Sequence, residues 1–207
     1  IAIPAIGYIM FLPPTRLADL IPKAEFLVRH LQVKFINFSQ SLQLLPGTPI
    51  VRRMEEAGLA DPEREHWDVG GYRFADPRVG FLASRLEGCN NQITLRSDAA
   101  INYIEVVLAI LERRVRSAGL NPAALPDPGR FKALKRRLGG VYLDFFRSAV
   151  ELAAGTWNER EFRRMMAARD RKVTQTMGEM QNWLLDFWGR RAPEGGETDE
   201  AVSHGPG

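Results

Sequence analysis

The pattern of apolar and polar positions changes character about halfway along the chain. Residues 1–12 are almost all apolar, and residues 33–45 mix β-branched and aromatic residues with alternating polar ones. Both patterns predict β-strands, the first of them covered on both faces. Residues 17–28 between them repeat apolar side chains at helical spacing, with Thr15 as the expected N-cap and Pro22 as an expected kink or interruption. A helical crossover of this length between two buried strands implies a parallel, right-handed connection.

The middle of the chain predicts a loop and a short helix. Residues 61–76 are polar, include two adjacent glycines and predict an irregular surface loop. Residues 76–88, "DPRVGFLASRLEG", predict a short helix that ends at Gly88.

From residue 97 the apolar spacing is helical throughout. Ser97 is the expected N-cap of a helix that ends at Gly119, and Thr156, with Glu159 three residues later, is the expected N-cap of the last helix. Residues 130–155 predict either a pair of helices or one helix broken at the adjacent glycines 139 and 140. The aromatic residues of this half are expected in the core; they are Tyr103, Tyr142, Trp157, Trp183 and Trp188.

These patterns predict three parts. Residues 1–95 form an α/β part, residues 96–191 an all-α region, and residues 192–207 an acidic, disordered tail. Two predicted strands cannot close a sheet, so the first part is expected to be a piece of a larger α/β sheet or barrel. The first residue, Ile1, already lies inside an apolar run, which suggests that the sequence begins within a longer protein.

Composition excludes some classes of protein. The chain of 207 residues is 45% hydrophobic and 26% charged, which is typical of a protein with a packed core. The apolar run at the start is broken by Pro4 and Gly7 and is too short to span a membrane, so we expect no membrane partner and a cytoplasmic location.

The net charge of +3 is unevenly distributed. Residues 96–191 carry eighteen basic and eleven acidic side chains, whereas residues 1–95 carry ten of each. A basic helical segment can attract a nucleic acid or an acidic protein. We expect solvated helix faces instead, which makes a nucleic-acid partner unlikely.

Residues with catalytic chemistry are few. Cys89 is the only cysteine, which excludes a disulfide and a cysteine-based metal site within the chain, and nothing near it in sequence predicts a lowered pKa. His66 follows Glu63 at a spacing found in carboxylate-bridged metal sites, but the further motifs that such a site needs are missing. We therefore expect no metal site and identify no catalytic residue.

Two segments resemble a known family. "AIGYIMFLPPTRLADLIPKAEFL" at residues 5–27 and "LQLLPGTPIVRRMEEAGL" at residues 42–59 resemble radical S-adenosylmethionine (SAM) enzymes, in particular the group with an N-terminal cobalamin-binding domain. The resemblance covers residues 1–95. It implies that the two strands are the fifth and sixth of a partial (βα)6 TIM-like barrel, so that the expected fold class is α/β plus α.

The resemblance also implies a cofactor site at the carboxyl ends of these strands. The residues expected to line the pocket for the adenosyl group of SAM are Gly7, Ile9, Phe11, Leu45, Pro46 and Gly47. Two positions depart from the family pattern, since Leu12 replaces an acidic residue and Arg16 replaces a threonine. A 4Fe-4S cluster and cobalamin are implied as further cofactors, but their binding residues do not occur in this chain.

The implied function is that of the C-terminal portion of a cobalamin-dependent radical SAM enzyme, a methyltransferase or a related enzyme that functionalises a C–H bond of a small-molecule substrate. Such enzymes take electrons from a donor such as flavodoxin or ferredoxin. The alternative that the residues leave open is a non-catalytic basic helical module that binds a protein or a nucleic acid.

Overall fold

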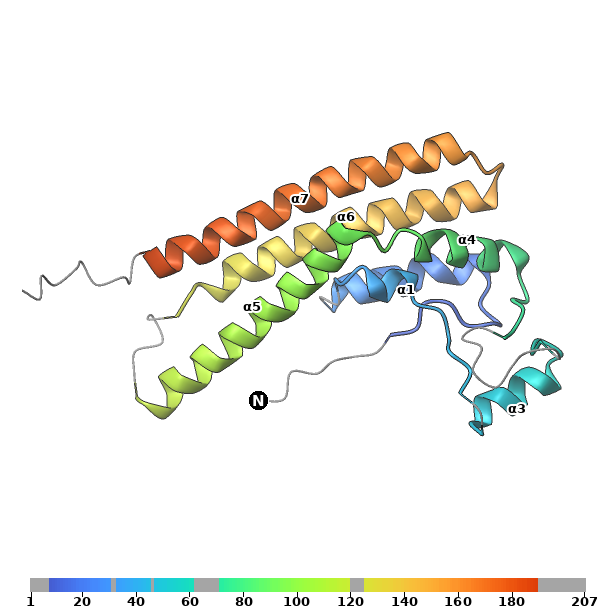
Figure 1. Ribbon diagram of the computed structural model, residues 1–207, viewed down its shortest axis with the longest axis horizontal. Coiled ribbons are helices and arrows are strands. Elements are labelled where there is room, and N and C mark those ends of the chain that lie inside the picture. Colours follow the sequence, from blue (N-terminus) through green and yellow to red (C-terminus); the bar gives the residue numbers. More distant parts are fainter. Residues whose placement is uncertain (1–7, 31–32, 46, 62–70, 120–124, 190–207) are drawn as a thin grey trace, which may run out of the picture.

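The computed structural model describes residues 8–30, 33–45, 47–61, 71–119 and 125–189, and within these ranges it contains seven helices and no β-strand (Figure 1). The helices are α1 (Leu17–Arg29), α2 (Ile36–Ser39), α3 (Pro49–Glu56), α4 (Pro77–Glu87), α5 (Gln92–Ser117), α6 (Pro128–Ala154) and α7 (Glu159–Gly189).

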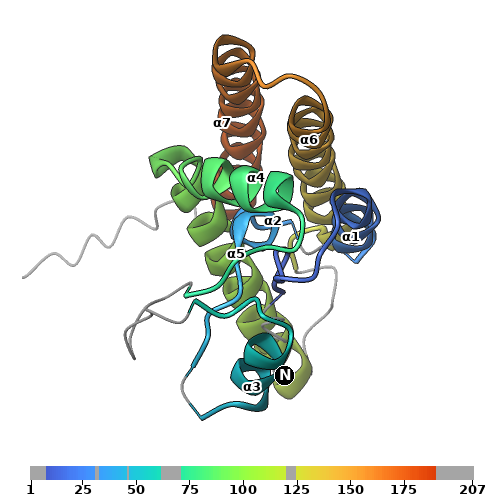
Figure 2. The ribbon, with the colours of Figure 1, turned by 90° about the vertical axis from the view of Figure 1, so that its right-hand side faces the viewer.

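Helix α6 lies at the centre of the molecule. It runs side by side with α7 in the opposite direction and also packs against α1 and α4 (Figures 1 and 2). The main core follows this arrangement, and its largest fully buried side chains include Phe11, Phe35, Phe38, Tyr142 and Phe146. Residues from both predicted parts of the chain therefore share one core.

Helix α3 lies apart from the long helices (Figures 1 and 2). Its apolar side chains Val51 and Met54 pack with Leu42 and Leu44 in a second, smaller cluster, to which Ile9 also contributes. The segment around residue 42 therefore connects the two cores.

The predicted partial (βα)6 barrel with strands five and six is wrong, because the described residues form an all-α fold. Residues 1–7 of the first predicted strand lie outside the described residues. The two segments do meet in parallel, but only at one isolated bridge between Phe11 and Ser41. A sheet requires a continued ladder of such pairs and further neighbouring strands, and the described residues provide neither.

Part of the second predicted strand is the short helix α2. The carboxylate of Asp98 on α5 accepts hydrogen bonds from the backbone N–H groups of Phe35 and Ile36, at 2.9 and 3.2 Å. These donors lie at the start of α2, where a helix leaves N–H groups without internal partners. A residue more than sixty positions away thus stabilises a helix in a segment whose local pattern favours a strand.

The predicted N-cap of α1 was wrong, because Arg16 precedes the helix and Thr15 is buried, where its hydroxyl accepts from Lys23 Nζ at 2.9 Å. The ends of α4 were predicted correctly. Helix α4 begins after Asp76, whose side chain accepts a hydrogen bond from Arg78 N, and Gly88 follows its last residue, as predicted. Helix α3 has Thr48 at the N-cap position and Pro49 as its first residue, but the Thr48 hydroxyl donates to Leu45 O and does not cap the helix. Pro22 lies within α1 without interrupting it.

Three expectations in the helical half were wrong. Helix α5 begins after Asn91, whose side chain accepts hydrogen bonds from Ile93 N and Thr94 N, so Ser97 is buried inside the helix and does not cap it. Helix α7 begins at Glu159, and the side chain of Asn158, not Thr156, accepts a hydrogen bond from Glu161 N. Helix α6 continues through both glycines and is neither a pair nor broken.

The expected burial of aromatic residues in this half was partly confirmed. Tyr142 and Trp183 belong to the core. Tyr103 and Trp188 do not, since 66% and 49% of their surfaces are exposed.

Candidate functional site

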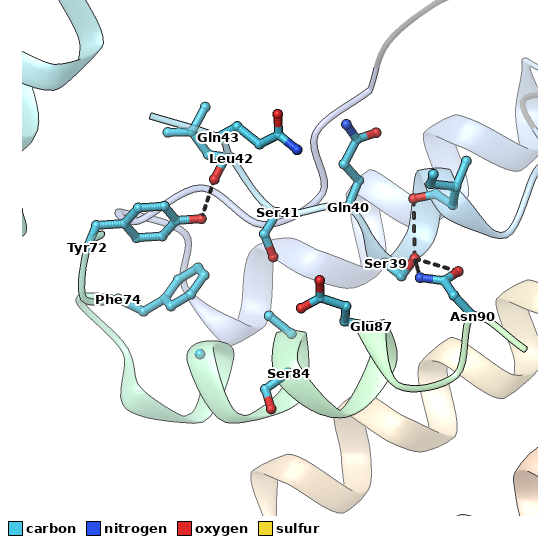
Figure 3. Close-up of a pocket in the computed structure, with 13 residues that line it drawn as sticks. Ser39, Gln40, Ser41, Leu42, Gln43, Tyr72, Phe74, Ser84, Glu87 and Asn90 are labelled. Carbon is cyan, nitrogen blue, oxygen red and sulfur yellow. Dashed lines mark hydrogen bonds between the residues drawn. The ribbon is translucent and has the colours of Figure 1, made fainter. Parts of the chain in front are cut away.

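A cavity of about 330 Å³ lies between residues 39–43, residues 72–74 and helix α4 (Figure 3). We call it the Ser41 cavity. It opens to solvent, and the described residues that line it are Ile36, Ser39, Gln40, Ser41, Leu42, Gln43, Tyr72, Phe74, Gly80, Ala83, Ser84, Glu87 and Asn90. Its volume is within the range of small-molecule sites in proteins.

One wall of the cavity is the extended segment that follows α2. Gln40 accepts hydrogen bonds through its carbonyl oxygen from Met10 N and Phe11 N, and Leu42 N donates to Phe11 O at 3.0 Å. These bonds hold residues 40–42 extended. Because successive side chains of an extended segment point to opposite sides, Ser41 faces the cavity while Gln40 points away from it (Figure 3).

The opposite wall comes from residues 72–74 and α4. The hydroxyl of Tyr72 donates to Leu42 O at 2.8 Å, which joins the two walls at one end. The rings of Tyr72 and Phe74 meet edge to face with 5.3 Å between their centroids. Phe74 lies so close to Gly80 that a Cβ atom at this glycine would stand 2.8 Å from the Phe74 ring. The absence of a side chain at residue 80 therefore sets the position of this aromatic wall.

Glu87 brings negative charge to the cavity. Figure 3 shows its carboxylate directed from α4 toward Ser41. Its charge contributes to the raised pKa of Tyr72, which burial of the phenol brings to about 12. Among the described residues Glu87 has no cationic partner within 4 Å, and none of the described lining residues is basic.

Asn90 closes the other end of the cavity. Its side-chain N–H group donates to the hydroxyl of Ser39 at 3.1 Å, so these two polar groups satisfy each other. Two polar side chains face each other across the cavity: Ser41, which also forms a side-chain hydrogen bond with Tyr72, and Glu87.

The residues predicted for the SAM site are not gathered around this cavity. Gly7 and Pro46 lie outside the described residues. Phe11 is completely buried, and Ile9 packs in the second cluster beside Leu42 and Leu44. Leu45 is 61% exposed, and Gly47 adopts a positive φ of 79° in the turn before α3.

The side chains that line the Ser41 cavity were missed by sequence reasoning. Tyr72 and Phe74 lie in a segment that only predicted an irregular loop, and Glu87 lies on a helix with no recognisable motif. No local signal connects these residues to Ser41, because the walls are joined by contacts between segments distant in sequence, such as the hydrogen bond from Tyr72 to Leu42 O.

A buried cation was also missed. Arg169 on α7 is 2% exposed and donates to Asp170 Oδ1 at 2.7 and 2.9 Å and to Cys89 O at 3.3 Å. Its guanidinium lies 4.5 Å from the ring centroid of Phe35 and 4.7 Å from that of Phe145. Asn91 donates to the second oxygen of Asp170. This arrangement joins α7 to α6, to the start of α5 and to the segment before α2.

The described residues do not fit the implied cofactors. They contain no group of three residues suited to a metal ion, and burial raises the pKa of the single cysteine, Cys89. A cluster ligand must be a thiolate, and one buried thiol cannot replace a set of them. The Phe11 ring packs against Phe146, with 6.3 Å between the ring centroids, and leaves no free face for an adenine.

Comparisons with protein-family models, with curated proteins and with solved structures found no match to this chain. Within the described residues, no helix has both the length and the hydropathy needed to cross a membrane.

Proposed function

We propose that this chain is the C-terminal portion of a cobalamin-dependent radical SAM enzyme that modifies a small molecule, and that its own role is to hold this molecule in the Ser41 cavity. The observation that supports the proposal is the parallel contact between Phe11 and Ser41. Beside this contact, Leu42 N donates to Phe11 O at 3.0 Å, which joins the two segments that carry the resemblance, and Leu42 and Gln43 of the second segment line the cavity.

The mixture of apolar and polar residues in the cavity walls agrees with the binding of a small molecule. Small-molecule sites combine apolar and aromatic walls with a few polar groups that fix the orientation of the ligand. Here Ile36, Ala83 and Phe74 supply apolar surface, while Ser41 and Glu87 supply the polar atoms.

The cofactors belong to other parts of the proposed enzyme. Cluster, SAM and cobalamin would be bound by residues beyond those that the structure describes, since the described residues do not fit them. An electron donor such as flavodoxin or ferredoxin is the proposed redox partner, and the cytoplasm is the proposed location.

The complete gene product tests the enzymatic class. Purified without oxygen, it is expected to contain iron and sulfide in the ratio of a 4Fe-4S cluster and to release 5′-deoxyadenosine from SAM when a reductant is added. A complete protein that contains neither cluster nor cobalamin and releases no 5′-deoxyadenosine contradicts the proposal.

The alternative of a basic binding module has less support from the arrangement of charges. Several basic side chains of the helical half form ion pairs with glutamates on other helices. Lys135 pairs with Glu105, Arg137 with Glu179 at 2.5 Å, and Arg147 with Glu25 at 2.6 Å. Part of the basic surplus thus connects helices to one another, so it is not available to a polyanion.

A further inference from the structure

We propose that the Ser41 cavity binds an organic cation, a primary amine attached to an aromatic or apolar body. The inference rests on the proposed role of the cavity as a binding site, but it does not depend on radical chemistry. It concerns the charge and shape of the ligand.

The charge follows from the residues that line the cavity. Among the described lining residues, Glu87 is the only carboxylate, and the phenol of Tyr72 is neutral at pH 7 as any tyrosine is. With no basic residue among the described lining residues, an anionic ligand would meet the Glu87 carboxylate without compensation. An ammonium group would instead form a charge-assisted hydrogen bond with it.

Ser41 supplies the second polar contact. Its side chain faces the cavity from the extended wall, and Figure 3 shows it opposite the Glu87 carboxylate. An ammonium group has three N–H donors. A hydroxyl oxygen and a carboxylate on facing walls can therefore accept from the same ammonium group.

The body of the ligand follows from the remaining surface. Phe74 forms an aromatic wall, and Ile36 and Ala83 provide aliphatic surface. An aromatic ring of the ligand can stack against Phe74 in an offset or edge-to-face arrangement. The Phe74 ring occupies the room that a side chain at residue 80 would need. A methyl group at residue 80 would therefore push that ring out of its present position.

Phenethylamine, phenethyl alcohol and 3-phenylpropionate test the charge selectivity, since they share an aromatic body and differ in their polar end. Calorimetric titration of the full chain at pH 7 is expected to show saturable binding of phenethylamine, binding at least about tenfold weaker for the alcohol, and none for the carboxylate. A tenfold ratio is what one moderately strong charge-assisted contact supplies.

Variants test the assignment to this cavity. Glu87→Gln keeps the shape of the side chain and removes its charge. This variant is expected to bind phenethylamine about tenfold more weakly, with an unchanged affinity for phenethyl alcohol. Gly80→Ala is expected to weaken both ligands, because it moves the aromatic wall. Glu151→Gln on α6 is the matched control, an exposed carboxylate that does not line the cavity, and should bind like the wild type. Circular dichroism of each variant checks that the helices are retained.

Two results would overturn the inference. One is binding of all three ligands with equal affinity, or of none of them by folded protein. The other is an unchanged affinity for phenethylamine in folded Glu87→Gln protein. Neither result bears on cluster content or on release of 5′-deoxyadenosine, so failure of this inference can be told apart from failure of the proposed enzymatic class.

Discussion

Gly139 on helix α6 lies directly against the side chain of Val33, in the segment that leads into α2. A Cβ atom at residue 139 would stand 2.7 Å from Val33 Cγ1 and 3.2 Å from Val28 Cγ1. Valine is branched at Cβ and has few alternative rotamers, so neither side chain can easily move aside. The close approach of α1 and its following segment to α6 therefore requires the absence of a side chain at residue 139.

This contact predicts opposite effects at two adjacent glycines. Gly139→Ala is expected to destabilise the protein by about 1 kcal/mol, because overpacking outweighs the gain in helix propensity. At Gly140 a Cβ atom would meet nothing within 4 Å. Gly140→Ala should therefore stabilise by about 0.5–1 kcal/mol through propensity alone. Urea denaturation of both variants measures the difference, and two variants of equal stability would contradict the close packing.

The second prediction concerns the buried guanidinium of Arg169. Arg169→Ala removes its bonds to Asp170 and Cys89 O and opens space between Phe35 and Phe145. Loss of one partner of a buried ion pair typically costs about 3–5 kcal/mol. The neighbouring Arg171 is exposed, and Arg171→Ala is the control, expected to change stability by less than about 0.5 kcal/mol. Similar denaturation midpoints for the two variants would show that Arg169 does not join the helices.

Burial of Cys89 gives a prediction about reactivity. The residue is 1% exposed, its thiol donates to Arg85 O at 3.3 Å, and burial raises its pKa. Because the thiolate is the reactive form, the thiol should react with an aromatic disulfide reagent only when the protein unfolds. The labelling rate at pH 8 is expected to rise at least about a hundredfold between native buffer and denaturant, following the open population. Rapid labelling in native buffer would contradict the expected structural role of this cysteine.

Local signals in the sequence predicted the elements that depend on neighbouring residues. Asp76 and Gly88 define α4, because a side-chain cap and a terminal glycine act within one turn of the chain. The same reasoning failed where a contact with a residue distant in sequence determines the local structure. Asp98 stabilises a helix in a strand-like segment, and the close contact with Val33 accounts for a glycine at residue 139 within an unbroken helix.

The candidate site was harder to predict than the helices. Its walls are residues 39–43, residues 72–74 and helix α4. No motif in any of these segments indicates that it contacts the other two. The second segment of the resemblance does include Leu42 and Gln43, which line the cavity, but the resemblance assigned them to a sheet. A contact between Phe11 and Ser41 needs only two extended residues, whereas a barrel needs a full set of paired strands.

The last prediction is a pH dependence that Asp98 imposes on stability. Burial raises the pKa of Asp98 from 3.8 to about 6, although its hydrogen bonds with Phe35 N and Ile36 N act in the opposite direction. The folded protein thus holds the Asp98 proton more tightly than the unfolded chain does. Between about pH 4 and pH 6 the unfolded chain releases this proton first, so the contribution of Asp98 to stability falls as the pH rises.

The size of this effect can be isolated with Asp98→Asn, which does not titrate. A pKa difference of about two units corresponds to about 3 kcal/mol, so the stability of the wild type relative to the variant should fall by about 2–3 kcal/mol between pH 4 and pH 7. Asp76 and Glu159, whose pKa values are lowered, act in the opposite sense below about pH 4 and are present in both proteins. Urea unfolding at several pH values measures this difference. If it stays constant or grows in favour of the wild type, Asp98 is not held in the protonated form by burial, and its carboxylate must stabilise α2 in the charged state.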